Sequence, residues 1–329
     1  MTTTMRDVAK VAGVSVATVS HVVNDKPGAR IGDDARRRVQ EAVVALGYRP
    51  NALAKTLSEG SSRFIGLVAD AIATTPFAGQ IIHGAQDEAW RHGFVLLVAN
   101  TEGNAAAEND AIAMMLEHQV RGILYSTWYH REIQVPPPLQ HTETVLVNCF
   151  AADDAFPAIV PDEEQGGRTA TEQLLAAGHR RIAFINTTSP SPARSGRLAG
   201  YRSALATAGV DADGALVFEA APEQEGGYDA AAAVVDSGAT AVFCHNDRVA
   251  MGLYDGLRER GLRIPDDVAV IGFDNQDVIA AHLRPPLSTV ALPHYELGAA
   301  GVRTLLGLES PAAGARQLIA CPSIPRESV

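Results

Sequence analysis

Apolar residues recur at helical spacing in three segments of the first fifty residues. The stripes are Val8, Val11 and Ala12; Val19, Val22 and Val23; and Ala35, Val39, Ala42, Val43 and Leu46. Gly13 permits a tight turn after the first segment, and Ser15 is placed to cap the second. Asp33 and Asp34 open the third segment, and Gly47 closes it. The pattern predicts a three-helix head too small to be very stable by itself.

After Arg63 the pattern changes to short apolar runs that alternate with amphipathic stretches. Strands are predicted at 64–70, 94–100, 122–127, 144–149, 181–187, 241–247, 268–274 and 318–322. Helices are predicted at 80–92, 105–118, 166–177, 197–208, 229–236, 248–260 and 295–306. Such alternation predicts an α/β body with doubly wound parallel sheets, and its length is about that of two lobes with a cleft between them.

Domain boundaries follow from these patterns. Residues 1–50 form the predicted head, 51–63 a short helix and linker, and 64–329 the body. The chain is expected to cross between lobes near Pro161, near 290–293 and near 320–322, so the first lobe comprises 64–161 and 293–322 and the second 162–292. The tail after Pro325 is expected to have little regular structure.

Charge is distributed unevenly along the chain. The net charge is −11, which by itself argues against a nucleic-acid partner. The first 63 residues, however, hold 10 Lys and Arg and 6 Asp and Glu, a net charge of +4, and the rest carries −15. Phosphates repel an acidic body, so any DNA contact is expected on the basic head.

The second helix of the head faces outwards on the side opposite its apolar stripe. Its outward residues are predicted to be Val16, Ala17, Ser20, His21 and Asn24. In a helix-turn-helix this helix enters the major groove. Val16 and Ala17 suit thymine methyl groups, His21 suits a base edge, and Thr18, Ser20 and Asn24 suit phosphates. The alternative from the residues alone is a three-helix capping domain with a solvated polar face.

Polar residues close many of the predicted strands. They are Asp70, Asn100, Ser126, Asn148, Asn186, Asn246, Asp247 and Asp274. Ligands of parallel sheets bind beyond the carboxyl ends of strands, and these groups with Arg197 suit a polyhydroxylated ligand. Phe77, Trp128, Tyr129, Phe150 and Phe273 could stack on a sugar face. The alternatives are helix capping for each polar residue and core packing for the aromatics, which we favour for Phe150 and Phe273.

The chain resembles the lac repressor family (LacI/GalR) of bacterial transcription regulators along nearly its whole length. In the head the resemblance is carried by Asp7-Val-Ala-Lys10, Ala12-Gly-Val-Ser15, Ala17-Thr-Val-Ser-His-Val-Val-Asn24 and Gly47-Tyr-Arg-Pro-Asn-Ala-Leu-Ala54. In the body it is carried by Ile65-Gly-Leu-Val68, Ala177-Gly-His-Arg-Arg-Ile-Ala-Phe184, Arg197-Leu-Ala-Gly-Tyr201, Asn246-Asp247, Ile264-Pro-Asp-Asp-Val268, Ile271-Gly-Phe-Asp274, Pro285-Pro-Leu-Ser-Thr-Val290 and Arg326-Glu-Ser328.

The resemblance implies how the head reads DNA. Val16, Ala17 and His21 would set the operator sequence, and Leu57 would intercalate at the operator's centre as a wedge. The implied DNA-binding set is Ser15, Val16, Ala17, Thr18, Ser20, His21, Asn24, Tyr48, Asn51, Ala54 and Leu57. Residues 51–59 make only about two helical turns, too short for a stable isolated helix, so this hinge helix is expected to form on DNA beside its symmetry mate. The alternative for Leu57 is a core leucine under the body.

The resemblance also implies a dimeric repressor with a palindromic operator and a small-molecule effector, a sugar, bound between the lobes. The implied effector site is Phe77, Ser126, Trp128, Asn148, Arg197, Asn246 and Asp274. The family's usual Asn-Pro-Phe-Phe run is Thr75-Pro-Phe-Ala78 here, and Trp128-Tyr129-His130 could replace the missing aromatic wall. Arg194 could pair with an acidic effector, although a solvent-exposed charge is the favoured reading. Either sign of effector control, induction or corepression, stays open.

No catalytic, cofactor or metal motif stands out in the sequence. Cys244 and His245 are adjacent on a predicted strand, so their side chains would point to opposite faces. Cys149, Cys244 and Cys321 are far apart, which indicates buried free thiols and a cytoplasmic protein with no membrane span. Two other classes remain open: a periplasmic-type sugar-binding protein without a DNA role, and a sugar- or nucleoside-modifying enzyme.

Overall fold

The computed structural model describes residues 3–24, 31–48, 62–75, 78–211, 216–309 and 316–329. The chain forms two compact units, Met1–Arg63 and Phe64–Val329. The hinge segment predicted at 51–59, with Asn51, Ala54 and Leu57, lies outside the described residues, and so does Phe77.

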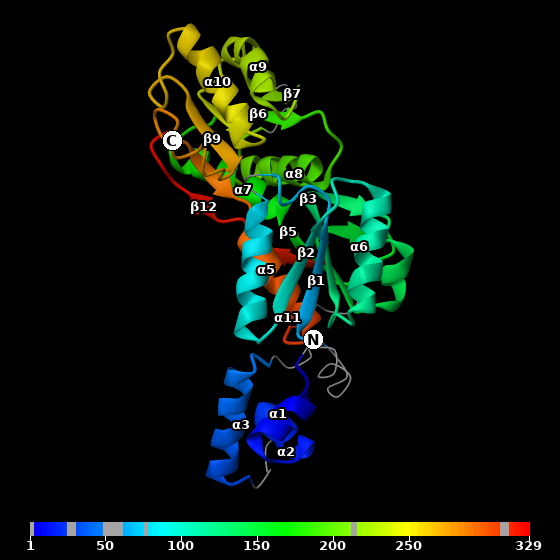
Figure 1. Cartoon of the computed structure of the whole chain (residues 1–329). Coiled ribbons are helices and arrows are strands. Elements are labelled where there is room, and N and C mark those ends of the chain that lie inside the picture. The colour runs from blue at the N-terminus through cyan, green and yellow to red at the C-terminus, as the bar shows by residue number, and fades with distance from the viewer. Residues whose placement is uncertain (1–2, 25–30, 49–61, 76–77, 212–215, 310–315) are drawn as a thin grey trace. The chain divides into compact units, whose positions relative to one another are not determined.

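The described part of the first unit contains three helices: α1 (Met5–Ala12), α2 (Val16–Val23) and α3 (Asp33–Ala45) (Figure 1). Thr4 and Asp7 form a capping box at the start of α1, and Gly13 ends that helix with a φ of 63°. The core consists of Val8, Ala9, Ala12, Val19, Val22, Val39, Ala42 and Tyr48. The prediction for Val11 is wrong, since 59% of this side chain is exposed. Successive helical residues turn by about 100°, which points Val11 away from Val8, Ala9 and Ala12.

The first lobe of the second unit contains a wholly parallel sheet in the order β11-β5-β4-β3-β1-β2. Its strands are β1 (Phe64–Ala69), β2 (Val95–Asn100), β3 (Ile123–Ile133), β4 (Thr144–Ala151), β5 (Ala158–Pro161) and β11 (Arg316–Ile319). Helices α5 (Gly79–Arg91) and α11 (His294–Leu305) lie side by side on one face, while α6 (Ala105–Glu117) covers the other (Figure 1). A 3-10 helix, η1 (Pro137–His141), precedes β4.

The second lobe repeats this plan in the order β12-β10-β9-β8-β6-β7, with only the β10–β12 pair antiparallel among the described strands. Its strands are β6 (Ile182–Thr187), β7 (Val217–Ala220), β8 (Ala241–Cys244), β9 (Ala269–Asp274), β10 (Ser288–Ala291) and β12 (Ser323–Ile324). Helices α7 (Glu163–Ala176) and α8 (Pro192–Thr207) pack on one face, and α9 (Gln224–Asp236) and α10 (Asp247–Glu259) on the other. The doubly wound fold class predicted for the body is confirmed.

The C-terminal tail differs from its prediction because it is fixed on the second lobe. Strand β12 pairs with β10, and the Ser328 Oγ donates to the Val270 carbonyl at 2.6 Å and accepts from the Ser288 N–H at 2.7 Å. The chain therefore passes between sheets three times, after β5, after β10 and after β11, and its last residues return to the second lobe.

Candidate functional site

The outward face of α2 holds most of the residues predicted to contact DNA. Ser15, Val16 and Ala17 are exposed, and Thr18, Ser20, His21 and Asn24 are half-buried. The Ser15 Oγ accepts from the Thr18 N–H at 3.1 Å and lies 2.9 Å from the Thr18 Oγ1. The Asn24 side chain donates to the Ser20 Oγ at 3.3 Å. The polar side chains are thus held against one another on the rim of the helix, while Val16 and Ala17 present methyl groups.

Tyr48, which was also predicted to bind DNA, is buried, unlike the residues on the outward face of α2. Its side chain is only 7% exposed and packs in the core of the head with Val39 and Ala42. Burial raises the pKa of its phenol, so the ring is neutral at physiological pH. The structure therefore gives Tyr48 a packing role in the free head.

A cavity of about 400 Å³ lies between residues of the two lobes. It is lined by Trp128, Tyr129, His130, Asn148, Glu163, Thr187, Ser189, Pro190, Ser191, Ala193, Arg197, Pro222, Glu223, His245, Asn246, Arg248, Asp274, Leu292 and His294. We call this cavity the cleft. It brings together five of the residues predicted for the effector site: Trp128, Asn148, Arg197, Asn246 and Asp274.

Ser126 does not line the cleft, which differs from its prediction. Its side chain is fully buried and its Oγ donates to the Val147 carbonyl at 2.8 Å, so it joins β3 to β4. Asn246 lines the cleft but also caps α10, where its Oδ1 accepts from the Val249 N–H at 2.8 Å. Asn246 therefore both caps a helix, which was the alternative interpretation, and lines the cleft.

Arg197 forms the centre of a buried charge network in the cleft. Its Nε donates to the Glu163 Oε2 at 2.9 Å, and its Nη1 donates to the His245 carbonyl and lies 3.7 Å from the Asp274 Oδ1. The guanidinium also lies over the Phe273 ring, 3.7 Å from its centroid. Sequence reasoning expected Arg197 to be available to a ligand, but its nearest carboxylate partner comes from the chain itself.

Two glycines allow Glu163 and Arg197 to meet. A Cβ at Gly196 would lie 2.6 Å from the Glu163 Cβ, and one at Gly167 would lie 2.4 Å from the Arg197 carbonyl oxygen. Helices α7 and α8 can therefore approach closely only because neither glycine carries a side chain at their contact. The Glu163–Arg197 salt bridge depends on this packing of two helices. The local sequence around Glu163 therefore could not predict that it pairs with Arg197.

The charge network gives two nearby carboxyl groups, those of Glu163 and Asp274, different pKa values. Burial would raise the pKa of Glu163, but Arg197 and His130 outweigh it and lower that pKa to about 2. Burial dominates at Asp274 and raises its pKa to about 6, although Arg197 opposes the shift. The difference follows from distance, because Arg197 is hydrogen-bonded to Glu163 and farther from Asp274. Glu163 is accordingly the permanent counter-ion of Arg197.

The aromatic wall of the cleft is held by Asp70. The Asp70 Oδ1 accepts from the Trp128 backbone N–H at 2.9 Å, and its Oδ2 accepts from Arg131 at 2.9 Å. Trp128 and Tyr129 contact each other edge to face, with centroids 4.8 Å apart. Phe150 and Phe273 are buried, as the core-packing reading expected. Arg194 forms an exposed ion pair with Glu219, in agreement with the reading of a solvated charge.

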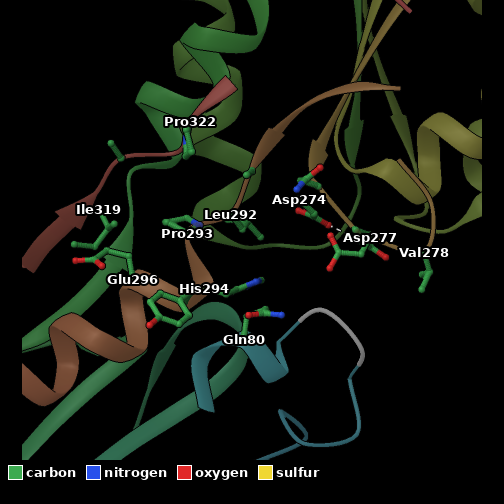
Figure 2. Close-up of a pocket in the computed structure, with 15 residues that line it drawn as sticks. Gln80, Asp274, Asp277, Val278, Leu292, Pro293, His294, Glu296, Ile319 and Pro322 are labelled. Atoms are coloured by element: carbon green, nitrogen blue, oxygen red, sulfur yellow. Dashed lines mark hydrogen bonds between the residues drawn. The ribbon is translucent and has the colours of Figure 1, made fainter. Parts of the chain in front are cut away.

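A second cavity, of about 520 Å³, adjoins the cleft where the chain passes between lobes (Figure 2). It shares Asp274, Leu292 and His294 with the cleft and adds Gln80 and Pro293 among others. Burial lowers the pKa of His294 to about 4, so this imidazole is neutral between the two cavities. Among the described residues, no cluster of His, Cys, Asp or Glu is arranged to hold a metal ion. Cys149, Cys244 and Cys321 are buried free thiols.

Each of the two units matches a known protein family. Residues 4–51 match the profile of bacterial regulatory proteins of the lacI family, and residues 171–329 match a periplasmic binding protein-like domain. The ribose operon repressor of Haemophilus influenzae is 32% identical over 336 residues, which cover 99% of this chain and 98% of that protein. The chain belongs to the lacI family of bacterial regulatory proteins.

Solved structures of lacI-family proteins agree with this assignment. The lac repressor dimer bound to operator and the anti-inducer ONPF has a TM-score of 0.80 and 27% identity, and the match covers 100% of this chain and 99% of that one. A lacI-family regulator from Enterococcus faecium with bound ribose has a TM-score of 0.62 and 27% identity, over 80% and 98% of the two chains.

The family assignment confirms that the chain is a DNA-binding transcriptional regulator, as its resemblance predicted, and its relatives are transcriptional regulators too. Within the described parts of the chain, no helix is both long enough and apolar enough to cross a membrane. His130 lines the cleft, within the run that was predicted to replace the missing aromatic wall. Sequence reasoning missed five other residues of the cleft: Glu163, Glu223, His245, Arg248 and His294. Of these five, only His245 carried a signal, its place next to Asn246 near the end of a predicted strand, where it was considered only as a poor base for Cys244.

Proposed function

We propose that this lacI-family protein is a dimeric cytoplasmic repressor whose affinity for a palindromic operator is set by a sugar bound in the cleft. The observation that carries the proposal is the combination, on one chain, of an exposed helix-turn-helix face and a cleft built from both lobes. The bound ribose of the Enterococcus faecium regulator and the operator-bound lac repressor dimer support the sugar and the DNA partner respectively.

The cleft has the chemistry that a polyhydroxylated ligand requires. Trp128 and Tyr129 offer an aromatic wall for the apolar face of a sugar. Among the described residues, nothing forms a hydrogen bond with the buried His130 Nε2 or the buried His245 Nδ1, so a ligand hydroxyl would satisfy groups that otherwise cost stability. Asp274 and Asn148 add acceptor and donor groups on the same cavity.

Effector control would act through the three passages between the lobes. A sugar that contacts both lobes stabilises the lobe arrangement in which those contacts are made, and only a difference in affinity between two arrangements can change DNA binding. A sugar that favours the arrangement of free protein induces transcription, and one that favours the operator-bound arrangement acts as a corepressor. The typical coupling of such sites is about 1–3 kcal/mol.

Selection of bound duplexes from random DNA tests the reading of DNA by α2. We expect the full chain to select a palindrome, and His21→Ala to change the preferred base pair at one position in each half-site. Thr18→Ala is the matched control, because loss of a phosphate contact weakens binding to all duplexes alike. The same selected sequence and a uniform loss for both variants would contradict the assigned roles. A panel of sugars that leaves operator affinity unchanged would contradict the effector half of the proposal.

Leu57 lies outside the described residues, and its role as a minor-groove wedge stays a prediction from the sequence. Leu57→Ala should reduce operator affinity by about tenfold or more and abolish the bend, because an alanine side chain is too short to separate base pairs. Sugar binding in the cleft should be unchanged. Gel mobility of circularly permuted duplexes measures the bend, and wild-type bending by the variant would refute the wedge.

A further inference from the structure

We propose that Glu163 makes the cleft selective for an uncharged hydroxylated ligand and excludes its phosphorylated counterpart, by keeping the Arg197 guanidinium neutralised. This inference rests on the proposed effector function and names the ligand class of the same site. It gives Glu163 the part of a specificity-determining residue, where the sequence alone left both neutral and acidic effectors open.

Each guanidinium on the described wall of the cleft already has a carboxylate partner. Arg197 is hydrogen-bonded to Glu163 at 2.9 Å and lies 3.7 Å from Asp274, while Arg248 contacts Glu223 at 2.8 Å. The described wall therefore holds three carboxylates and two guanidiniums. An anionic ligand would enter a site in which both guanidinium groups are already paired with carboxylates and the carboxylates outnumber them.

Displacing Glu163 from Arg197 would be costly because both groups are buried. Each side chain is only 4% exposed, so a phosphate that took Arg197 would leave the Glu163 carboxylate desolvated and beside a second anion. A sugar hydroxyl requires no displacement. It can donate to a carboxylate oxygen and accept from a ring N–H while the ion pair stays intact.

Two backbone N–H groups at the helix starts in the cleft wall are also engaged. The Ser191 Oγ and the Asn246 Oδ1 cap α8 and α10 and accept from the Arg194 and Val249 N–H groups at 3.2 Å and 2.8 Å. Each is one of the backbone donors that a helix N-terminus offers to an anion. Burial lowers the pKa of His245, so its imidazole is uncharged at neutral pH. No described residue forms a hydrogen bond with the His245 Nδ1, and a ligand hydroxyl group could form that bond.

Anion binding by Glu163→Gln tests the proposal on the full chain. Glutamine keeps the shape of the side chain and removes its charge, so Arg197 becomes available to an anion. Equilibrium dialysis should show that Glu163→Gln binds inorganic phosphate and D-ribose 5-phosphate about tenfold or more tightly than wild type does. Glu164→Gln is the matched control, since it removes the same charge from the next residue of α7. The Glu164 side chain is 58% exposed and pairs only loosely with Arg168, so no gain is expected.

The wild-type protein supplies a second measurement that does not depend on the variant's folding. Thermal shifts with D-ribose and D-glucose should exceed those with their phosphate esters at equal concentration. Tighter binding of a phosphate ester than of its neutral sugar by wild type would overturn the proposal. So would a Glu163→Gln protein that gains no more phosphate affinity than Glu164→Gln. The dialysis needs neither DNA nor the natural effector, so a failure of the repressor proposal would be seen separately, in the operator experiments.

Discussion

Arg197→Met is expected to lower the free energy of unfolding of the Phe64–Val329 unit by about 3–5 kcal/mol. The methionine keeps much of the apolar stem that covers Phe273, but it removes the guanidinium that is hydrogen-bonded to Glu163 and leaves this buried carboxylate beside His130 without that counter-ion. An unpaired buried charge is destabilising because it has lost hydration without gaining a counter-ion. Urea unfolding followed by tryptophan fluorescence measures the loss, since Trp90 and Trp128 both lie in this unit.

Arg194→Met provides the control on the same helix. Arg194 lies three residues before Arg197 and pairs with Glu219, but the two side chains are 39% and 51% exposed. Exposed pairs of this kind contribute about 0–1 kcal/mol, so this variant should unfold nearly like wild type. An Arg197→Met protein within 1 kcal/mol of wild type would show that the buried network does not carry the stability assigned to it here.

The pH dependence of the Arg197→Met effect follows from Glu163. Arg197 and His130, against the opposing effect of burial, hold the folded-state pKa of Glu163 at about 2, below its ordinary value of 4.5. A carboxyl with a lowered pKa stabilises the fold above its unfolded pKa and loses that contribution as the pH falls toward its folded pKa. The unfolded chain contributes equally to both proteins, so the stability difference between wild type and Arg197→Met should be largest where Glu163 is ionised in both folded proteins and shrink as the pH falls toward 2. A difference that grows on acidification would contradict this assignment.

The elements of the body could largely be predicted from sequence because their signals are local. Long amphipathic stretches and apolar runs gave nearly every long helix and most strands, and α10 differs from its prediction by one residue at each end. The four-residue strands β5, β7 and β10 were missed, as was the two-residue strand β12, because short runs give a weak periodic signal, although β8 is equally short and was predicted. The tail was misjudged because its order depends on partners such as Ser288 and Val270, which lie about forty to sixty residues away.

The cleft was predictable only in part, for a related reason. Asn246 follows β8 and Asp274 ends β9, and parallel sheets bring such positions to one edge. Trp128 and Asn148 were also expected at strand ends, but they lie inside β3 and β4. Glu163 gave no such signal, and His130 was named only as part of the Trp128-Tyr129-His130 run. Their role arises from the approach of α7 to α8 and of one lobe to the other, so it depends on residues that are distant in sequence. Ser126 carried the same strand-end signal as Asn148 but points into the sheet, where it bonds to Val147.

Gly167→Ala should be strongly destabilising, with a loss of about 3 kcal/mol or more in the free energy of unfolding. The added Cβ would lie 2.4 Å from the Arg197 carbonyl oxygen and 2.6 Å from its Cα, and backbone atoms cannot rotate away as a side chain can. Helix α8 must then move from α7, and the same movement draws Arg197 away from Glu163. Gly79→Ala, at the start of α5, is the control, because no described residue has an atom within 4 Å of its added Cβ.

A double-mutant cycle separates this packing effect from general destabilisation. If Gly167 acts by letting Glu163 and Arg197 meet, the ion pair is already weakened in the Gly167→Ala protein, and Glu163→Gln should cost less there than in wild type. The Gly167→Ala protein should also bind inorganic phosphate more tightly than wild type, since its Arg197 is less neutralised. Additive free energies and unchanged phosphate affinity would mean that Gly167 serves helix packing alone. Non-additivity would tie the ligand preference of the cleft to the absence of one side chain between α7 and α8.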